Sequence, residues 1–336
     1  PELQALLARM LAEGARYAVI EASSHGLVQK RLEGCHIDVA AVTNITHDHL
    51  DYHGSYEAYR DAKAELFRGL LTSARKPGKP KVAVLNADDP AYPFLRAIPA
   101  DEHLSYSLQG GADLTLTDVA QQGRGWRCRA ETPNGAFELY TPLPGRFNLS
   151  NVLAAIAVSI SQGIPNEAIQ AGVARFAGSE GRMQEVDLGQ GFRAVVDFAH
   201  TPNALDQAIG AARRMADPSP YPPPKGRGDS PPRPPGEGWG EGRSLGRVIT
   251  VFGSAGKRDV AKRALMAGSS VRAADLTVLT AEDPRTESLD AILATMAAAA
   301  RAAGGVEGET FWRVADRGQA IYFALSLARP GDVVLV

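Results

Sequence analysis

The sequence has little cysteine, no long apolar run and no excess of charge of one sign. Its two cysteines, Cys35 and Cys128, are too few for a disulfide framework and are typical of a reducing compartment. No run approaches the roughly 20 apolar residues that cross a bilayer, which excludes a membrane span. A net charge of −2 lacks the dense basic surface that nucleic-acid phosphates require. We therefore expect a cytoplasmic protein without membrane or nucleic-acid partners.

Strand-like and helix-like stretches alternate along most of the chain. Apolar runs rich in β-formers predict strands at 17–21, 39–44, 81–86, 194–198, 247–252, 276–280 and 332–336. Helix-period stretches lie between many of them, at 56–70, 202–215, 261–273, 289–302 and 317–327. Strands separated by helices of roughly 10–15 residues indicate βαβ units and a parallel sheet.

The fold class that follows is α/β with two domains. Between residues 104 and 140 alternating strands with glycine turns predict a small antiparallel part. The boundary falls at Gly178–Gly181, so we expect a central domain over 1–178, with a mostly parallel sheet, and a second, Rossmann-like α/β domain over 179–336. The first 16 residues read as an amphipathic helix. Since the chain starts at Pro1 and stops inside an apolar run at Val336, we expect a fragment.

Residues 217–243 differ from the rest in composition, because they contain nine of the 22 prolines. A mixture of proline, glycine and charge cannot bury enough apolar surface to order itself. We interpret this segment as a disordered insert between a helix and a strand. A proline-rich docking site is the alternative.

Histidines and carboxylates gather near two predicted strand ends. Five of the seven histidines fall between residues 25 and 53, and Glu21 closes the strand predicted at 17–21. Because the carboxyl ends of neighbouring parallel strands share one edge of a sheet, this density predicts a metal site rather than ordinary loop histidines. A zinc interpretation is the alternative, since His47-x-His49-x-Asp51 resembles the metallo-β-lactamase-like motif. There a histidine directly follows the aspartate, whereas here it is one residue late, at His53, and zinc geometry tolerates that shift poorly.

A longer series of motifs follows in order along the chain. The motifs are Glu21-Ala-Ser23-Ser24-His25-Gly26-Leu-Val-Gln29, Asn44-Ile-Thr46-His47-Asp48-His49-Leu50-Asp51-Tyr52-His53-Gly54, Ala62-Lys63, Asn86-Ala87-Asp88-Asp89, Gly145-Arg146-Phe147-Asn148-Leu-Ser-Asn151, Gly181-Arg182-Met183, Asp197-Phe198-Ala199-His200-Thr201-Pro202 and Asp283-Pro284-Arg285. Together these motifs resemble those of the Mur ligases, ATP-dependent enzymes that add amino acids in bacterial cell-wall synthesis, and among them the UDP-N-acetylmuramoyl-tripeptide synthetase branch. Their number and order make this signal far more specific than a single short motif.

The resemblance implies ATP and Mg²⁺ as cofactors. Glu21, His49 and a carbamylated Lys63 would hold Mg²⁺, and Lys63 and His200 would be catalytic. We expect the ends of the three metal-site side chains within roughly 4–8 Å of each other, since ions bridge ligands at about 2–2.5 Å. The alternative for Lys63 is a solvated lysine on a helix surface, near Asp61 and Glu65.

The resemblance also implies residues for nucleotide and substrate. The ATP-binding positions are Asn86, Asn148, Asn151, Arg182 and Asp197. The positions for the UDP-muramoyl peptide and the incoming amino acid are Ser23, Gln29, Arg31, Arg258, Asp283, Pro284 and Arg285. As alternatives, Asn148 would cap the helix that follows it, and Arg258 would be an ordinary arginine at a helix start, unfavourable against the helix dipole.

The implied reaction adds a diamino acid to UDP-N-acetylmuramoyl-L-alanyl-D-glutamate through an acyl phosphate, with the enzyme a monomer. The branch hallmark is Asp-Asn-Pro-Arg, whereas this chain reads Glu282-Asp283-Pro284-Arg285. The retained arginine favours meso-diaminopimelate, and the aspartate keeps lysine or ornithine open.

Other interpretations stay open at this point. The phosphate loop of the family is expected upstream of this chain, so the fragment alone is expected to be inactive. A D-alanyl-D-alanine-adding ligase, a folylpolyglutamate synthetase and a catalytically incomplete remnant are the alternatives. The Ser-Ser-His-Gly-Leu and Asp-Pro-Arg motifs argue against the first two.

Overall fold

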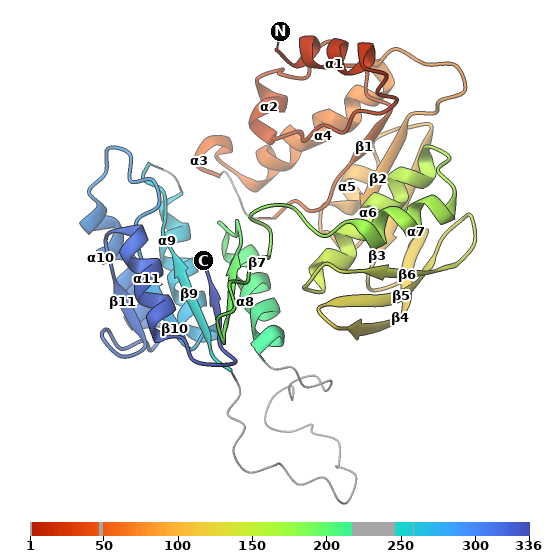
Figure 1. The fold of residues 1–336 in the computed structure, drawn as a ribbon. Helices are drawn as coiled ribbons and strands as arrows, with labels where there is room; N and C mark the ends of the chain where they lie inside the picture. Colours follow the sequence, from red (N-terminus) through yellow and green to blue (C-terminus); the bar gives the residue numbers. More distant parts are fainter. Residues whose placement is uncertain (1, 47–49, 217–245, 258) are drawn as a thin grey trace, which may run out of the picture. The chain divides into compact units, whose positions relative to one another are not determined.

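A computed structural model describes residues 2–46, 50–216, 246–257 and 259–336. The described chain forms two compact units (Figure 1). Unit 1 contains residues 1–120, 126–142 and 146–176, and unit 2 contains 121–125, 143–145 and 177–336. The insert predicted at 217–243 lies outside the described residues.

Unit 1 is built on a six-stranded sheet in the order β1-β2-β3-β4-β5-β6. Its strands are β1 (Val39–Ala41), β2 (Val82–Asn86), β3 (Glu102–Ser107), β4 (Leu114–Gln122), β5 (Gly125–Glu131) and β6 (Phe137–Thr141). Strands β1 to β4 pair in parallel, and β5 pairs antiparallel with β6. A mostly parallel sheet with a small antiparallel part is thus confirmed. The antiparallel region is shorter than predicted, because β3 and β4 continue the parallel pairing.

Helices cover both faces of this sheet (Figure 1). Unit 1 contains α1 (Glu2–Ala12), α2 (Ser24–Val28), α3 (Leu50–His53), α4 (Tyr56–Thr72), α5 (Tyr92–Arg96), α6 (Phe147–Ser161) and α7 (Asn166–Arg175), of which α4 to α7 contact the strands. Every residue of β2 is buried, as expected for a central parallel strand. Ala83 and Leu85 pack in one core cluster with Phe67 of α4 and Leu95 of α5. Since side chains alternate along a strand, the other face of β2 is left to α6, which contacts β1, β2 and β3.

The prediction of a strand at 17–21 is wrong. These residues have no regular secondary structure, and Val19 is 96% exposed. An apolar β-rich run becomes a strand only by pairing with a neighbour. In the part of the chain that the structure describes, β1 is the edge strand, and 17–21 does not pair with it.

Unit 2 contains a second six-stranded sheet, in the order β11-β10-β9-β12-β8-β7. Its strands are β7 (Gln184–Val186), β8 (Arg193–Val196), β9 (Val248–Phe252), β10 (Leu276–Leu279), β11 (Phe311–Arg313) and β12 (Val333–Leu335). All neighbours pair in parallel except β7 with β8. Its helices are α8 (Pro202–Ala216), α9 (Val260–Ala273), α10 (Leu289–Ala302) and α11 (Arg317–Leu327). The second α/β unit with alternating strands and helices is thereby confirmed.

Strands β9 and β12 are buried along their whole length. Ile249 and Val251 of β9 and Val334 of β12 form a core cluster with Ala320 and Ala324 of α11. The carboxyl ends of β9 and β10 lie side by side, with Phe252 opposite Leu279. The loops that follow these two strands therefore share one edge of the sheet. No helix in the described ranges is long and apolar enough to cross a bilayer.

Candidate active site

Three of the sequence motifs meet around α2, α3 and α4 of unit 1. Ser24 on α2 is buried, and its Oγ lies 3.0 Å from Nε2 of His53 on α3. The His25 ring centroid is 4.1 Å from that of Tyr52, and the His53 centroid is 5.4 Å from that of Tyr59 on α4. These contacts join the Ser-Ser-His and Asp-Tyr-His motifs to Tyr59 in one side-chain cluster, and Tyr59 in turn contacts Lys63 of the Ala-Lys motif.

Lys63 lies on α4 at the edge of this cluster. It is half-buried, with Nζ 5.3 Å from the Tyr59 ring centroid. The two carboxylates near it in sequence bind another residue, because Asp61 and Glu65 pair with Arg68 at 3.0 and 2.5 Å. Asp61 and Glu65 therefore have the Arg68 guanidinium as their partner.

Of the other two predicted metal ligands, Glu21 is among the described residues. Glu21 lies in the exposed stretch before α2, and His49 lies outside the described residues. Among the described residues no group of three or more His, Cys, Asp and Glu side chains is placed to hold a metal. Convergence of Glu21, His49 and Lys63 therefore stays a prediction.

Predicted substrate residues lie at both ends of α2. Ser23 is its N-cap, and its Oγ accepts a hydrogen bond of 3.1 Å from the Gly26 N–H. At the other end Arg31 donates to the Gln29 side-chain oxygen at 2.7 Å. Gln29 and Arg31 are both exposed, so this pair presents a guanidinium and an amide together.

Two predicted adenine-binding asparagines contact each other on α6. The Asn151 side chain donates to the Asn148 Oδ1 at 3.0 Å. The alternative that Asn148 caps the helix is wrong, because the N-cap is Arg146 and it makes no side-chain capping bond. Both amides thus lie one turn apart on the helix surface.

Asn86, a predicted ATP-binding residue, is 7% exposed and bonded within unit 1. Its side-chain N–H donates to the Thr43 carbonyl at 2.7 Å. Asp89, three residues on, accepts from the Ile45 N–H at 2.7 Å, and the Tyr106 hydroxyl donates to the Val42 carbonyl at 2.8 Å. These buried groups anchor the loop 42–46 that leads to residues 47–49. The interpretation from sequence missed this role of Asp89, although its motif was recognised.

In unit 2, Asp197 connects two motifs. Its carboxylate accepts from the Met183 N–H at 2.8 Å and from the Ala199 N–H at 2.9 Å. Burial raises the pKa of the Asp197 carboxyl above its ordinary value, while these two hydrogen bonds oppose the rise. The Arg182 guanidinium stacks over the Phe198 ring at 4.6 Å. A cation and a carboxylate are thus held next to each other.

His200 lies beside this pair. Its Nδ1 is 3.1 Å from the Phe198 carbonyl oxygen, and its ring centroid is 5.0 Å from that of Phe198. Phe198 is 60% exposed, so its ring forms an open surface flanked by Arg182 and His200.

The predicted amino-acid site is built from the loops that follow β9 and β10. The Gly256 N–H donates to the Asp283 carbonyl at 2.7 Å. A Cβ on Gly256 would lie 2.0 Å from the Pro284 carbonyl oxygen, so the two backbones touch without room for a side chain. Arg285 has a left-handed φ of 51°, and its Nε lies 3.5 Å from the Asp283 carboxylate. Arg258 lies outside the described residues, directly after the loop 253–257.

Two side chains that the sequence did not single out join these loops. The Arg263 guanidinium, on α9, lies 2.8 Å from the Glu287 carboxylate, and Glu287 also accepts from the Lys257 N–H. In the sequence, the one feature that links this pair to the predicted site is the position of Glu287, two residues after Arg285.

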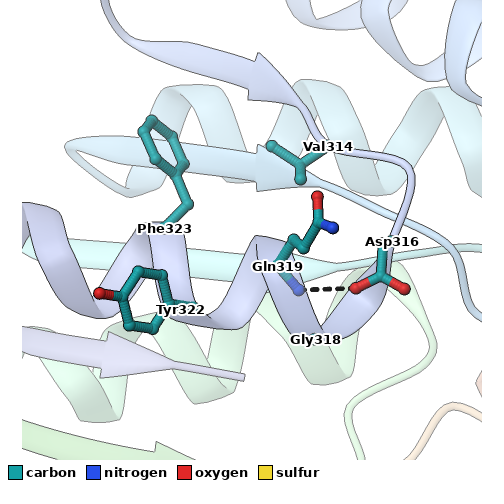
Figure 2. A pocket seen from close by; sticks show the side chains of 6 residues that line it. All are labelled: Val314, Asp316, Gly318, Gln319, Tyr322 and Phe323. Atoms are coloured by element: carbon teal, nitrogen blue, oxygen red, sulfur yellow. Dashed lines mark hydrogen bonds between the residues drawn. The ribbon is translucent and has the colours of Figure 1, made fainter.

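Two hollows in the surface lie apart from these clusters. One, of about 620 Å³, runs along α11 and is lined by residues from Val314 to Phe323, where Asp316 caps the helix through Gln319 (Figure 2). The other, of about 480 Å³, lies between α4 and the turn after α2, near Cys35. No predicted site residue lines either one.

Residues from both units match domain descriptions of one class of ligase. The family description "Mur ligase middle domain" matches residues 1–159, and "Mur ligase, glutamate ligase domain" matches residues 238–336. The chain therefore belongs to the Mur ligase family.

Similar proteins support the same assignment. The chain is 42% identical to a UDP-N-acetylmuramyl-tripeptide synthetase of Roseiflexus sp., over 100% of this chain and 62% of that protein. It is 37% identical to the UDP-N-acetylmuramoyl-L-alanyl-D-glutamate–2,6-diaminopimelate ligase of Bacillus licheniformis, over 99% of this chain and 61% of that one. A solved structure of a ligase with the latter name matches with a TM-score of 0.58 at 33% identity, covering 99% of this chain and 61% of that chain. The chain thus spans about three fifths of these relatives.

Proposed function

We propose that this chain is part of an ATP-dependent ligase that forms an amide bond in peptidoglycan synthesis. Its substrates are UDP-N-acetylmuramoyl-L-alanyl-D-glutamate and a diamino acid, with meso-diaminopimelate favoured. The observation that carries the proposal is the pairing of the loops after β9 and β10, which brings Asp283 and Arg285 to the loop that ends before residue 258. The names of the relatives support the same substrates.

The reaction has two steps. The γ-phosphoryl group of ATP passes to the terminal carboxylate of the D-glutamate, which gives an acyl phosphate and ADP. The amine of the diamino acid then attacks the carbonyl carbon, and phosphate leaves as the amide forms. Since phosphoryl transfer needs positioned positive charge more than covalent chemistry, arginines suit this reaction.

Lys63 and His200 are the proposed catalytic side chains. Tyr59 and Phe198 lie against them and restrict their orientations. Carbamylation would turn the Lys63 cation into an anion with two oxygen donors. Together with Glu21 and His49, this gives a set dominated by oxygen, which suits Mg²⁺. When bound, Mg²⁺ supplies charge that neutralises the phosphates.

Nucleotide and peptide positions follow the same proposal. Asn148 and Asn151 present neighbouring amides to adenine, and Arg182 and Asp197 meet the phosphates and ribose. Ser23, Gln29 and Arg31 contact the UDP-muramoyl peptide, since a guanidinium binds carboxylates and phosphates well.

The charges of Asp283 and Arg285 favour diaminopimelate as the amino acid that is added. Diaminopimelate ends in an ammonium and a carboxylate, whereas lysine ends in an ammonium alone. The Arg285 guanidinium suits the carboxylate, and Asp283, whose side chain is 65% exposed, can accept the ammonium. Pro284 between them restricts the backbone that separates the two charges.

One observation favours lysine or ornithine as the second candidate. The Asp283 carboxylate lies 3.5 Å from the Arg285 Nε and partly neutralises that guanidinium. A neutralised arginine attracts a distal carboxylate less strongly, which reduces the expected preference for diaminopimelate over lysine or ornithine.

A ligation assay with the complete enzyme tests the proposal. With meso-diaminopimelate, L-lysine and L-ornithine in turn, we expect the fastest turnover with the first. Arg285→Ala should lower kcat/KM for diaminopimelate by about 10–100-fold, because hydrogen bonds to charged groups contribute about 1.5–3 kcal/mol, and it should change lysine addition far less. Arg301→Ala, on the far end of α10, is the control for loss of one positive charge. Faster turnover with lysine or ornithine would refute the choice of acceptor.

The domain limits also remain proposals. We assign 1–178 to the central domain and 179–336 to the C-terminal domain. We further propose a monomer that works in the cytoplasm, where ATP and a nucleotide-linked substrate are available.

A further inference from the structure

An ion pair between a buried arginine and a half-buried glutamate joins the two loops of the proposed amino-acid site. The Arg263 side chain is 5% exposed and that of Glu287 is 29% exposed, with 2.8 Å between guanidinium nitrogen and carboxylate oxygen. Arg263 also donates to the Ala255 carbonyl at 3.3 Å. The Arg263 end of the pair is therefore buried beneath the loops, while the Glu287 end is partly open to solvent.

Glu287 connects the second loop to the first. One carboxylate oxygen accepts from the Lys257 N–H and the other binds Arg263. The Lys257 N–H and then the Arg263 guanidinium hold the pKa of Glu287 below its ordinary value, so this group stays ionised. Lys257 has a left-handed φ of 49°, a conformation that a non-glycine residue keeps only when its surroundings hold it.

The ion pair is attached to the two loops at Ala255, Lys257 and Glu287. These three points flank the parts of the loops that are proposed to face the acceptor. Ala255 and Lys257 flank Gly256, whose backbone is pressed against Pro284. Glu287 in turn follows the left-handed Arg285 by two residues. Moving the Glu287 carboxylate would therefore move residue 257 and the turn that carries Asp283 and Arg285.

We propose that Arg263 and Glu287 are positioning residues that set the spacing between the loop 253–257 and the loop 283–287, and so the length of amino acid that the site accepts. This inference rests on the proposed function. In this proposal neither side chain contacts the acceptor itself. An ion pair that is largely removed from water contributes little net stability compared with an apolar pair of the same size, so we assign its effect to geometry.

The matched control is a second ion pair in the same unit. Arg247 and Asp332 lie 2.6 Å apart, and Asp332 also accepts from the N–H groups of Arg247 and Arg329. This pair immediately precedes β9 and β12, at the edge of the sheet opposite to the loops. It shares partial burial and backbone hydrogen bonds with the first pair, but not its position.

Steady-state kinetics of the complete enzyme test the inference. Glu287→Gln keeps the side-chain size but removes the charge, and we expect the KM for the diamino acid to rise about tenfold or more. The KM values for ATP and for the UDP-muramoyl dipeptide should stay within about twofold. Asp332→Asn should lower the melting temperature as much or more without changing the KM for the diamino acid.

A double replacement separates geometry from stability. Arg263→Met with Glu287→Met substitutes an apolar pair, which should keep the melting temperature near that of the unmodified enzyme while the raised KM persists. An unchanged KM in Glu287→Gln and in the double variant would overturn the inference, as would an equal rise in Asp332→Asn. If the unmodified enzyme ligates no diamino acid at all, the proposed function fails, and the inference fails with it.

Discussion

Asp89→Ala should release the loop that leads into the His-Asp-His motif. The carboxylate of Asp89 accepts from the N–H groups of Ile45 and Ala91, at 2.7 and 2.8 Å. Both donors belong to residues that are 1% exposed, so water cannot replace the lost acceptor. Hydrogen bonds to a charged group contribute about 1.5–3 kcal/mol each, so the two together predict a loss of about 3–6 kcal/mol.

Hydrogen exchange with mass spectrometry measures this directly. Peptides that contain Ile45 should exchange much faster in Asp89→Ala than in the unmodified protein, because their amide loses its only described side-chain acceptor. Asp88→Ala is the control, since Asp88 makes the same kind of bond to the Leu108 N–H at 2.7 Å, beyond the end of β3. It should speed exchange near residue 108 and leave residues 42–46 protected. Unchanged exchange at Ile45 in Asp89→Ala would refute the anchoring role of the carboxylate.

Two further predictions concern acid stability and thiol reactivity. The Arg75 guanidinium and then the Lys81 N–H lower the pKa of Asp101 to about 2, below the value of an unfolded chain. The ionised Asp101 therefore stabilises the folded protein fully above about pH 4, and this stabilisation disappears as the pH falls toward 2. Asp101→Asn should flatten the acid limb of a denaturation profile, and an unaltered limb would contradict this. Burial raises the pKa of the Cys128 thiol to about 11, and its side chain is fully buried. A thiol reagent should thus modify only Cys35 in the native protein and both cysteines in denaturant; two native equivalents would contradict this.

Much of the second unit was predictable because its signals are local. Helices α10 and α11 have the predicted bounds, since each follows a side chain that caps it: Ser288 accepts from the Ala291 N–H, and Asp316 from the Gln319 N–H. Strands buried on both faces, such as β2 and β9, appear as continuous apolar runs, which the sequence displays directly.

The errors have tertiary causes. The run 17–21 has the composition of a strand, but pairing is a property of two segments, and composition describes one. The motif around Asn148 has an asparagine where a cap is common, but Arg146 occupies the N-cap with helical backbone angles, which leaves the asparagine inside the first turn. Neither outcome could be read from the residues themselves.

Candidate site residues were recognisable only where a motif contained them. Asp89 finds its partner Ile45 at a separation of 44 positions, and Glu287 finds Lys257 at 30. Such pairs depend on which strands become neighbours in the sheet, and a local sequence pattern does not indicate strand order. The motifs thus indicated the residues that are proposed to face the substrates, while the residues that hold those motifs in place required coordinates.

The contact between Gly256 and Pro284 limits how this protein can evolve. Any other residue at 256 would place a carbon 2.0 Å from a backbone oxygen, so a single substitution there displaces the second loop. The exposed Asp283 side chain has no such restriction. Under the proposed function, replacements at positions such as 283 are therefore the expected route to a different amino acid, whereas the distance between the loops is inherited almost unaltered.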